Sequence, residues 1–248
     1  MVFASRVRSG QFIFGEYDMK NKEKLKKEMI ENAYTKFCEI RKPNSRALSW
    51  EHCIAQFAAA FDNPKEAASN EKTVDLLSLH MGFFLASWGM MRNSKLMEYD
   101  YKIHAPLVRT LLGYPDLFRK DVADFLDPKA MERLKEMHEA VEEHCSQFSE
   151  AKSYNASDIL VSKIILGTLG IAPAYDTNVS TVVEKYGISG GTFSPAAFGE
   201  FVQYFTENHT DITERMTKEM QALCPHYTRA KVIDGILWIL GGDSVAKE

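Results

Sequence analysis

The sequence contains few of the residues that interrupt helices. Its 14 glycines and 8 prolines make up about 9% of the 248 residues, below the roughly 12% of average proteins. Because β-sandwiches and barrels join many short strands through glycine- and proline-rich turns, this shortage disfavours both folds. No long segment alternates apolar and polar residues as a half-buried strand does. The sequence therefore predicts an all-α fold.

Clustered cysteine and excess positive charge are also absent. The four cysteines lie far apart, without zinc-finger or C-x-x-C spacing. Free thiols and an N-terminus that lacks a long apolar run favour a protein of the reducing cytoplasm. The formal net charge of −4 excludes a protein that coats nucleic acid through bulk positive charge. A local basic groove remains compatible with it.

The longest apolar segment is too short to cross a membrane. Residues 76–91 include no Asp, Glu, Lys or Arg, but a membrane-spanning helix needs about 20 apolar residues. Since Gly82 and Gly89 lie within this segment and polar residues flank it, we expect a helix at the centre of a globular core. No membrane partner is expected.

Apolar periodicity predicts further helices along the chain. They cover 20–41, a stretch beginning near Ser49, and 105–125, 128–149, 158–170, 177–186, 195–207, 210–223 and 228–241. Glycines at 187–191 and 241–242 are expected to end the helices before them. The polar stretch 146–157 lacks this periodicity, so residues 1–248 are predicted to form one all-α unit with a lobe boundary near 146–157.

Motifs of the common enzyme classes are missing. The sequence has no P-loop, no G-x-G-x-x-G, no H-E-x-x-H and no G-x-S-x-G. His138, Glu142 and Cys145 would share one face of a helix, as metal ligands can. The segment around them is highly charged and typical of a solvated surface. We therefore expect neither a metal ion nor another cofactor.

Asp176 is the leading candidate for a catalytic group. An apolar helix and a connection with glycine and proline precede it, and Val179, Val182 and Val183 predict a second helix after it. At the N-terminus of that helix a carboxylate accepts backbone N–H bonds and is stabilised by the helix dipole. The simplest interpretation is an ordinary N-cap.

The string Asp176-Thr-Asn-Val, with the helix, turn and proline before it, resembles a segment of the helix-hairpin-helix DNA glycosylase superfamily. In that superfamily a V-D-T-H-V type of string carries the catalytic aspartate. The predicted final helix also resembles the C-terminal helix of these proteins, so the resemblance lies mainly in residues 158–241. It implies a two-lobed helical fold, DNA as the partner, and Asp176 as the catalytic carboxylate without a cofactor.

Two features of the superfamily are absent. Its hairpin signature, L-P-G-[VI]-G-x-x-[TS]-A, is replaced by residues 153–158. The position of the nucleophilic lysine in bifunctional members falls near Asp158 and Ile159, which implies no Schiff-base lyase from that position. The chain therefore resembles a divergent, monofunctional glycosylase that excises a damaged or modified base. The missing hairpin favours an unusual substrate, such as a hypermodified base in phage DNA, so antiviral defence stands beside DNA repair.

Aromatic and basic residues near the ends of two predicted helices are candidates for a base pocket. Aromatic side chains stack on a flipped base, and basic ones contact the neighbouring phosphates. The candidate substrate-binding residues are Trp88, Arg92, Asn93, Lys95, Lys163, Tyr175 and Asn178.

Most of these residues also have a structural interpretation. Trp88 could complete a core helix whose charged end is solvated. Lys163 lies in an apolar stretch, where the simpler expectation is that its stem reaches out to solvent, and the alternative is that it lines a cavity. Tyr175 either walls the pocket or packs in the core. In the final helix, we expect Trp238 in the core and Asp234 paired with a nearby Arg229 or Lys231.

Two other functions remain open. The first is a non-enzymatic all-α binding protein in which Asp176 is only a helix cap. The second is a nucleoside or nucleotide hydrolase that uses the same carboxylate on a small substrate.

Overall fold

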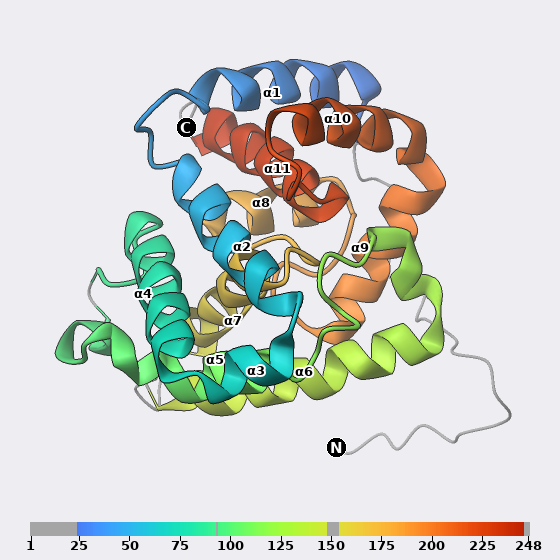
Figure 1. Cartoon of the computed structure of the whole chain (residues 1–248). Helices are drawn as coiled ribbons and strands as arrows, with labels where there is room; N and C mark the ends of the chain where they lie inside the picture. Colours follow the sequence, from blue (N-terminus) through green and yellow to red (C-terminus); the bar gives the residue numbers. More distant parts are fainter. Residues whose placement is uncertain (1–23, 93, 148–153, 246–248) are drawn as a thin grey trace, which may run out of the picture.

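The chain is all-α throughout the residues that the computed structural model describes, which are 24–92, 94–147 and 154–245 (Figure 1). These ranges contain 11 α-helices and no strand, so the predicted fold class is confirmed. The α-helices are α1 (Lys27–Ile40), α2 (Leu48–Phe61), α3 (Pro64–Ser69), α4 (Glu71–Ser87), α5 (Ala105–Leu111), α6 (Pro128–Ser146), α7 (Tyr154–Thr168), α8 (Thr177–Lys185), α9 (Pro195–Asn208), α10 (Thr210–Leu223) and α11 (Arg229–Val245). Short 3-10 helices are η1 (Lys95–Glu98), η2 (Tyr101–His104) and η3 (Val122–Leu126).

Capping side chains and prolines determine where several helices begin. The Asn70 side chain accepts the N–H groups of Lys72 and Thr73 at the start of α4. Asp127 and Ser194 cap α6 and α9, and each stands directly before a proline. Such caps satisfy N–H groups that have no partner inside the helix, and proline fits the first helical position. These local signals explain why most predicted helices are found within a few residues of their expected bounds.

The buried apolar residues form one continuous cluster that extends from Leu25 to Ile239. The last helix closes this core: α11 packs mainly against α8 and α1, and Figure 1 shows it between them. The first described residues lie near the end of α8, where Tyr186 contacts Met29, and the end of α11 lies beside the start of α8, where Gly241 meets Asn178. The predicted lobe boundary includes residues 148–153, which lie outside the described residues.

The prediction that Gly241 and Gly242 end the final helix is wrong, because α11 continues to Val245. Gly241 allows close packing instead. A Cβ atom on Gly241 would lie 2.2 Å from the backbone oxygen of Asn178, a distance that no side chain tolerates. Glycine in this part of the helix is therefore needed for the approach of α11 to α8.

The apolar segment 76–91 is not wholly a central helix. Helix α4 ends at Ser87, and Gly89 adopts a left-handed conformation with φ +80°. One face of α4, formed by Leu76, Leu79 and Phe83, is exposed, while the opposite face packs in the core. No helix among the described residues is long and apolar enough to span a membrane.

The segment around His138 is also more buried than its charge suggests. His138, His144 and Cys145 lie on the inner face of α6 and are buried, so the expected solvated surface covers only the opposite face. The nearby pair of His138 Nδ1 and Glu142 Oε2 is 3.4 Å apart. In the described parts of the chain, no three His, Cys, Asp or Glu side chains come together as a metal site would require.

Two buried histidines predict that the protein loses stability in mild acid. His104 and His144 lie with ring centroids 5.8 Å apart, and burial lowers the pKa of each to about 4. An unfolded histidine has a pKa of about 6.5, so the unfolded chain binds more protons between these values. The free energy of unfolding should fall as the pH drops from about 6.5 to about 4, by up to about 1.4 kcal/mol per pH unit for each histidine.

Urea unfolding across this pH range measures the effect. The double variant His104→Gln/His144→Gln should show a flatter dependence than the wild type, whereas His52→Gln, at an exposed position, should leave it unchanged. An equally steep dependence in the double variant would assign the acid sensitivity to other groups.

Candidate active site

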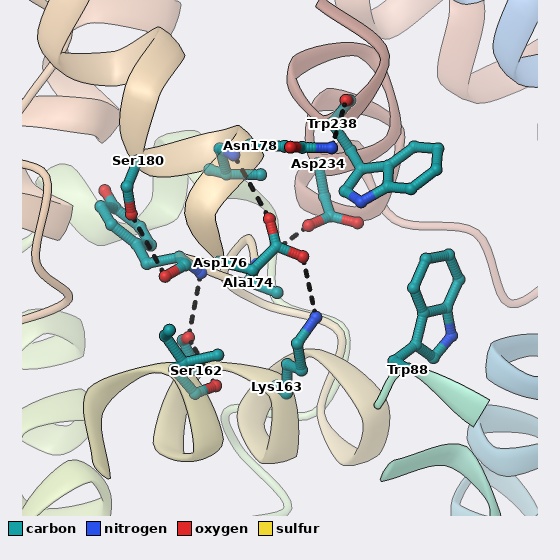
Figure 2. A network of polar contacts seen from close by, with 12 residues as sticks. Trp88, Ser162, Lys163, Ala174, Asp176, Asn178, Ser180, Asp234 and Trp238 are labelled. Atoms are coloured by element: carbon teal, nitrogen blue, oxygen red, sulfur yellow. Dashed lines mark hydrogen bonds and ion pairs between the residues drawn. The ribbon is translucent and has the colours of Figure 1, made fainter. Parts of the chain in front are cut away.

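A pocket lies where α1, α4, α7 and α11 meet the N-terminus of α8 (Figure 2). Its walls combine aromatic rings with two ammonium and two carboxylate groups. The lining residues are Phe37, Ile40, Phe84, Trp88, Lys163, Leu166, Ala174, Asp176, Lys231, Asp234, Gly235 and Trp238. The volume open to the centre of a water molecule is about 20 Å³, room for about one water.

Asp176 is held by both of its carboxylate oxygens. Oδ1 accepts the backbone N–H of Val179 at 3.3 Å, as an N-cap does, and Oδ2 accepts a hydrogen bond from Lys163 Nζ at 2.9 Å. The side chain is 19% exposed, so it reaches the pocket and is only partly solvated. The predicted N-cap is confirmed, and the same carboxylate forms an ion pair that the sequence did not indicate.

Lys163 does not extend to solvent, so the simpler expectation for this residue is wrong. Its side chain is only 4% exposed and lines the pocket. Helix α7 is buried on nearly all sides from Leu160 onward, which leaves the lysine stem no short route to water. Asp176 supplies the opposite charge, and the Trp88 ring lies 5.6 Å from the ammonium group, within the range of a cation–π contact.

A second buried ion pair lies in the wall formed by α11. Lys231 Nζ is 2.7 Å from Asp234 Oδ2, with side chains 6% and 8% exposed. The expected pairing of Asp234 with Lys231 is therefore confirmed, while Arg229 pairs instead with Asp121 and Glu214.

The other oxygen of Asp234 links this pair to the first. Asp234 Oδ1 accepts the backbone N–H of Ala174 at 2.9 Å. Ala174 stands two residues before Asp176, and its carbonyl accepts the backbone N–H of Asp176 at 2.9 Å. Asp234 thus anchors the segment that presents the candidate catalytic carboxylate.

Two tryptophans form the aromatic side of the pocket. Trp88 and Trp238 meet edge to face, with centroids 5.7 Å apart, and both are half-buried rather than enclosed in the core. The indole N–H of Trp88 donates to Ser49 Oγ at 3.1 Å. The exposed guanidinium of Arg46 lies 5.2 Å from the Trp88 ring and 5.8 Å from the Trp238 ring.

Other residues predicted for the site lie elsewhere or serve the fold. Arg92 is exposed and Lys95 half-buried, and neither lines the pocket. Asn93 lies outside the described residues. Tyr175 packs in the core with its hydroxyl 3.0 Å from Ser189 Oγ, and burial raises its pKa. Asn178 does not line the pocket either.

The Asn178 side chain instead joins α8 to α11. Its Nδ2 donates to the backbone oxygen of Trp238 at 3.3 Å, next to the close approach at Gly241. Of the predicted site residues, the pocket therefore brings together Asp176, Lys163 and Trp88.

Lys231 and Asp234 line the pocket although neither was predicted for the site, and Arg46, which lies over its tryptophans, was not predicted either. The sequence signals for these residues are weak. Lys231 and Asp234 are three residues apart on an apolar helix, and Arg46 lies in a short basic loop between two helices. Only the folded chain brings Lys231 and Asp234 into one pocket with Asp176 and places Arg46 over its tryptophans.

Comparison of the chain with protein-family models, with curated proteins and with solved structures finds no match. The groups that line the pocket indicate its chemistry. A fixed carboxylate stabilises a developing positive charge nearby, aromatic walls accept a flat ring, and buried ammonium groups donate hydrogen bonds to acceptor atoms.

The ion pair between Lys163 and Asp176 should be strongly coupled in stability. Asp176→Asn keeps a capping oxygen but leaves the Lys163 ammonium without its carboxylate, at a cost of about 3 kcal/mol, and Lys163→Met should cost a similar amount. The double variant should be more stable than the sum of the two losses predicts, by about 2 kcal/mol.

Urea unfolding of the four proteins in this cycle measures the coupling. The exposed pair of Arg215 and Glu219, 2.9 Å apart, is the matched control and should show less than about 0.5 kcal/mol. Additive losses at Lys163 and Asp176 would show that the two charges do not stabilise each other.

Proposed function

We propose that this protein hydrolyses the N-glycosidic bond of a damaged or modified base in DNA, with Asp176 as the catalytic carboxylate. The observation that carries the proposal is the setting of Asp176. Its carboxylate is held by Val179 and Lys163 at the edge of a pocket with aromatic walls. The resemblance of the segment ending at Asp176 to the helix-hairpin-helix glycosylases supports the same role.

The chemistry of the reaction calls for such a group. Cleavage of an N-glycosidic bond places positive charge on the sugar, as in other glycoside hydrolyses. A carboxylate beside C1′ stabilises that charge and orients the water that attacks it. Because Lys163 and the N-terminus of α8 fix the carboxylate before substrate arrives, little reorganisation is needed during the reaction.

The base must leave the DNA helix to reach this site. Since the pocket has room for about one water, a base enters only when side chains at its mouth move apart. Trp88 is suited to this movement because it follows the end of α4 and precedes Gly89 with its φ of +80°. Arg46, which lies over both indoles, would turn to a phosphate beside the flipped nucleotide.

The substrate base is either a lesion of cellular DNA or a hypermodified base of phage DNA, which would give the protein a role in repair or in antiviral defence. A net charge of −4 suits a protein that recognises a flipped base through its pocket. Bulk attraction to the phosphate backbone contributes little in such a protein.

A second candidate is a non-enzymatic all-α protein in which the two ion pairs only stabilise the fold. The observation that favours it is that the four charges of the pocket pair with one another, around a volume of only about 20 Å³. A nucleoside hydrolase is the third candidate, and free nucleosides would then compete with DNA.

Excision that depends on Asp176 is the decisive test. Duplex DNA carrying damaged or hypermodified bases is treated with the protein and then with alkali, which breaks strands at abasic sites. Asp176→Asn should lower the rate of strand breakage by at least about 100-fold, because the carboxylate no longer stabilises the sugar cation.

The matched control is Asp127→Asn, which changes another N-cap aspartate that does not line the pocket. It should retain the wild-type rate. Equal breakage by the wild type and Asp176→Asn would exclude Asp176 as the catalytic group, and inhibition by free nucleosides would favour the smaller substrate.

The role of Lys163 is tested separately, by reduction with borohydride during the reaction. Lys163 donates to Asp176 as an ammonium group, and an ammonium group has no free electron pair with which to attack C1′. We therefore expect hydrolysis without a covalent protein–DNA complex. A trapped complex that disappears in Lys163→Gln but persists in Lys185→Gln, at an exposed position, would assign lyase chemistry to Lys163.

A further inference from the structure

We infer that the pocket accepts a neutral base rich in acceptor atoms, and that Lys231 is the acid that protonates this base as it leaves. The inference rests on the proposed hydrolysis and adds two things to it: the chemical class of the substrate, and a catalytic residue that the sequence did not indicate. It depends on the position of Lys231 and on the distribution of charge around it.

Lys231 is buried among aromatic rings. Its Nζ lies 5.8 Å from the Phe37 ring, 5.6 Å from the Trp50 ring and 5.7 Å from the Trp88 ring. This ammonium group donates a hydrogen bond to Asp234 Oδ2 at 2.7 Å. An ammonium group has three N–H donors, so Lys231 keeps donors for an acceptor atom of a ligand.

The charges in the pocket disfavour a cationic base. Lys163 and Lys231 already place two positive charges against the Trp88 ring, and each of the two carboxylates already has a lysine partner. An alkylated base with a formal positive charge would bring a third cation into this buried site, where charges are weakly screened. A neutral base with carbonyl oxygens or ring nitrogens would instead accept hydrogen bonds.

The class of base determines whether an acid is needed. An alkylated cationic base leaves as a neutral molecule, whereas a neutral base leaves as an anion unless it receives a proton. An ammonium group positioned at the base therefore helps only the second class. The two ion pairs therefore have different roles. Lys163 positions Asp176, which faces the sugar, and Lys231 donates a proton to the base.

The C1′–N bond breaks and its electron pair goes to the base nitrogen, while the Lys231 ammonium transfers a proton to the departing base. Water forms a bond to C1′ and gives one proton to the Asp176 carboxylate. The products are the protonated, neutral base and an abasic sugar with a hydroxyl at C1′, and the proton on Asp176 returns through solvent to Lys231.

The experiment uses the full-length protein and three single-lesion duplexes. Two contain the neutral bases uracil and 5-fluorouracil, which are close in size but differ in leaving ability because fluorine acidifies the ring nitrogen. The third contains 7-methylguanine, which is cationic in DNA. We expect excision of the neutral bases to exceed that of 7-methylguanine by at least about 10-fold, and more efficient excision of 7-methylguanine would overturn the inferred substrate class.

Lys231→Arg tests the acid. Arginine keeps the positive charge and the pairing with Asp234 but does not release its proton. The kcat for uracil should fall by at least about 100-fold with little change in KM, and the fall should be much smaller for 5-fluorouracil. An equal loss for both bases would show a structural role only.

Two further variants serve as controls for this comparison. Lys218→Gln, at an exposed position on α10, should retain wild-type rates. If Lys231→Arg does not fold by circular dichroism, Lys231→Gln/Asp234→Asn removes the pair without leaving a buried charge and should show the same dependence on the leaving group.

A binding measurement separates failure of this inference from failure of the proposed function. All three tryptophans of the sequence lie at the pocket, since Trp88 and Trp238 line it and Trp50 is 5.6 Å from Lys231 Nζ. Quenching of tryptophan fluorescence by deoxyuridine and by 7-methyldeoxyguanosine therefore reports on this part of the protein. Tighter binding of deoxyuridine without any excision would support the pocket chemistry and refute hydrolysis, whereas equal or weaker binding of deoxyuridine would overturn the inference.

Discussion

Burial of two lysine–aspartate pairs among aromatic rings is the constraint on which this site depends. A single charge of this kind could not remain in the apolar interior, because its lost hydration would not be compensated. Lys163 is tolerated inside the fold because Asp176 lies 2.9 Å away, and Lys231 because Asp234 lies 2.7 Å away. The four residues therefore form one arrangement, in which the removal of any member leaves an opposite charge unsatisfied. Contacts within the protein fix their geometry, which the proposed catalysis by Asp176 would require.

The same arrangement holds the chain that carries Asp176. Asp234 accepts the N–H of Ala174, and the Ala174 carbonyl in turn accepts the N–H of Asp176. Helix α11 also packs closely on α8 where Gly241 meets Asn178. The last helix therefore determines the position and the orientation of the Asp176 carboxylate. A substitution on α11 can thus change the site without touching a ligand. This also explains why glycine is needed near the end of a long helix, where it would otherwise weaken the helix.

Local signals in the sequence accounted for the helices and for the cap at Asp176, but not for the composition of the pocket. Caps and prolines act within one turn, so the starts of α6, α8 and α9 were within reach of a sequence argument. The orientation of the Lys163 side chain could not be predicted from the sequence, because it depends on how deeply α7 is buried and on its partner Asp176, 13 residues away. The prediction that Gly241 ends the final helix was wrong for a related reason. Glycine can end a helix or permit close packing, and which of these applies depends on the neighbouring helix. The position of Arg46 over the pocket could not be predicted from the sequence, because basic residues in loops are common on protein surfaces.

The distribution of charge changes what a net charge of −4 means for a nucleic-acid partner. Arg92 and Lys95, the basic residues expected to form a groove, do not line the pocket. Arg46 is an exposed cation that lies over the two indoles of the pocket and has no carboxylate partner among the residues that the structure describes. One guanidinium group attracts a phosphate only at short range, since salt screens exposed charges beyond about 10 Å. In the proposed function, recognition would come from contacts of the base with the buried charges and aromatic walls, so selectivity would be determined after the base has left the DNA helix.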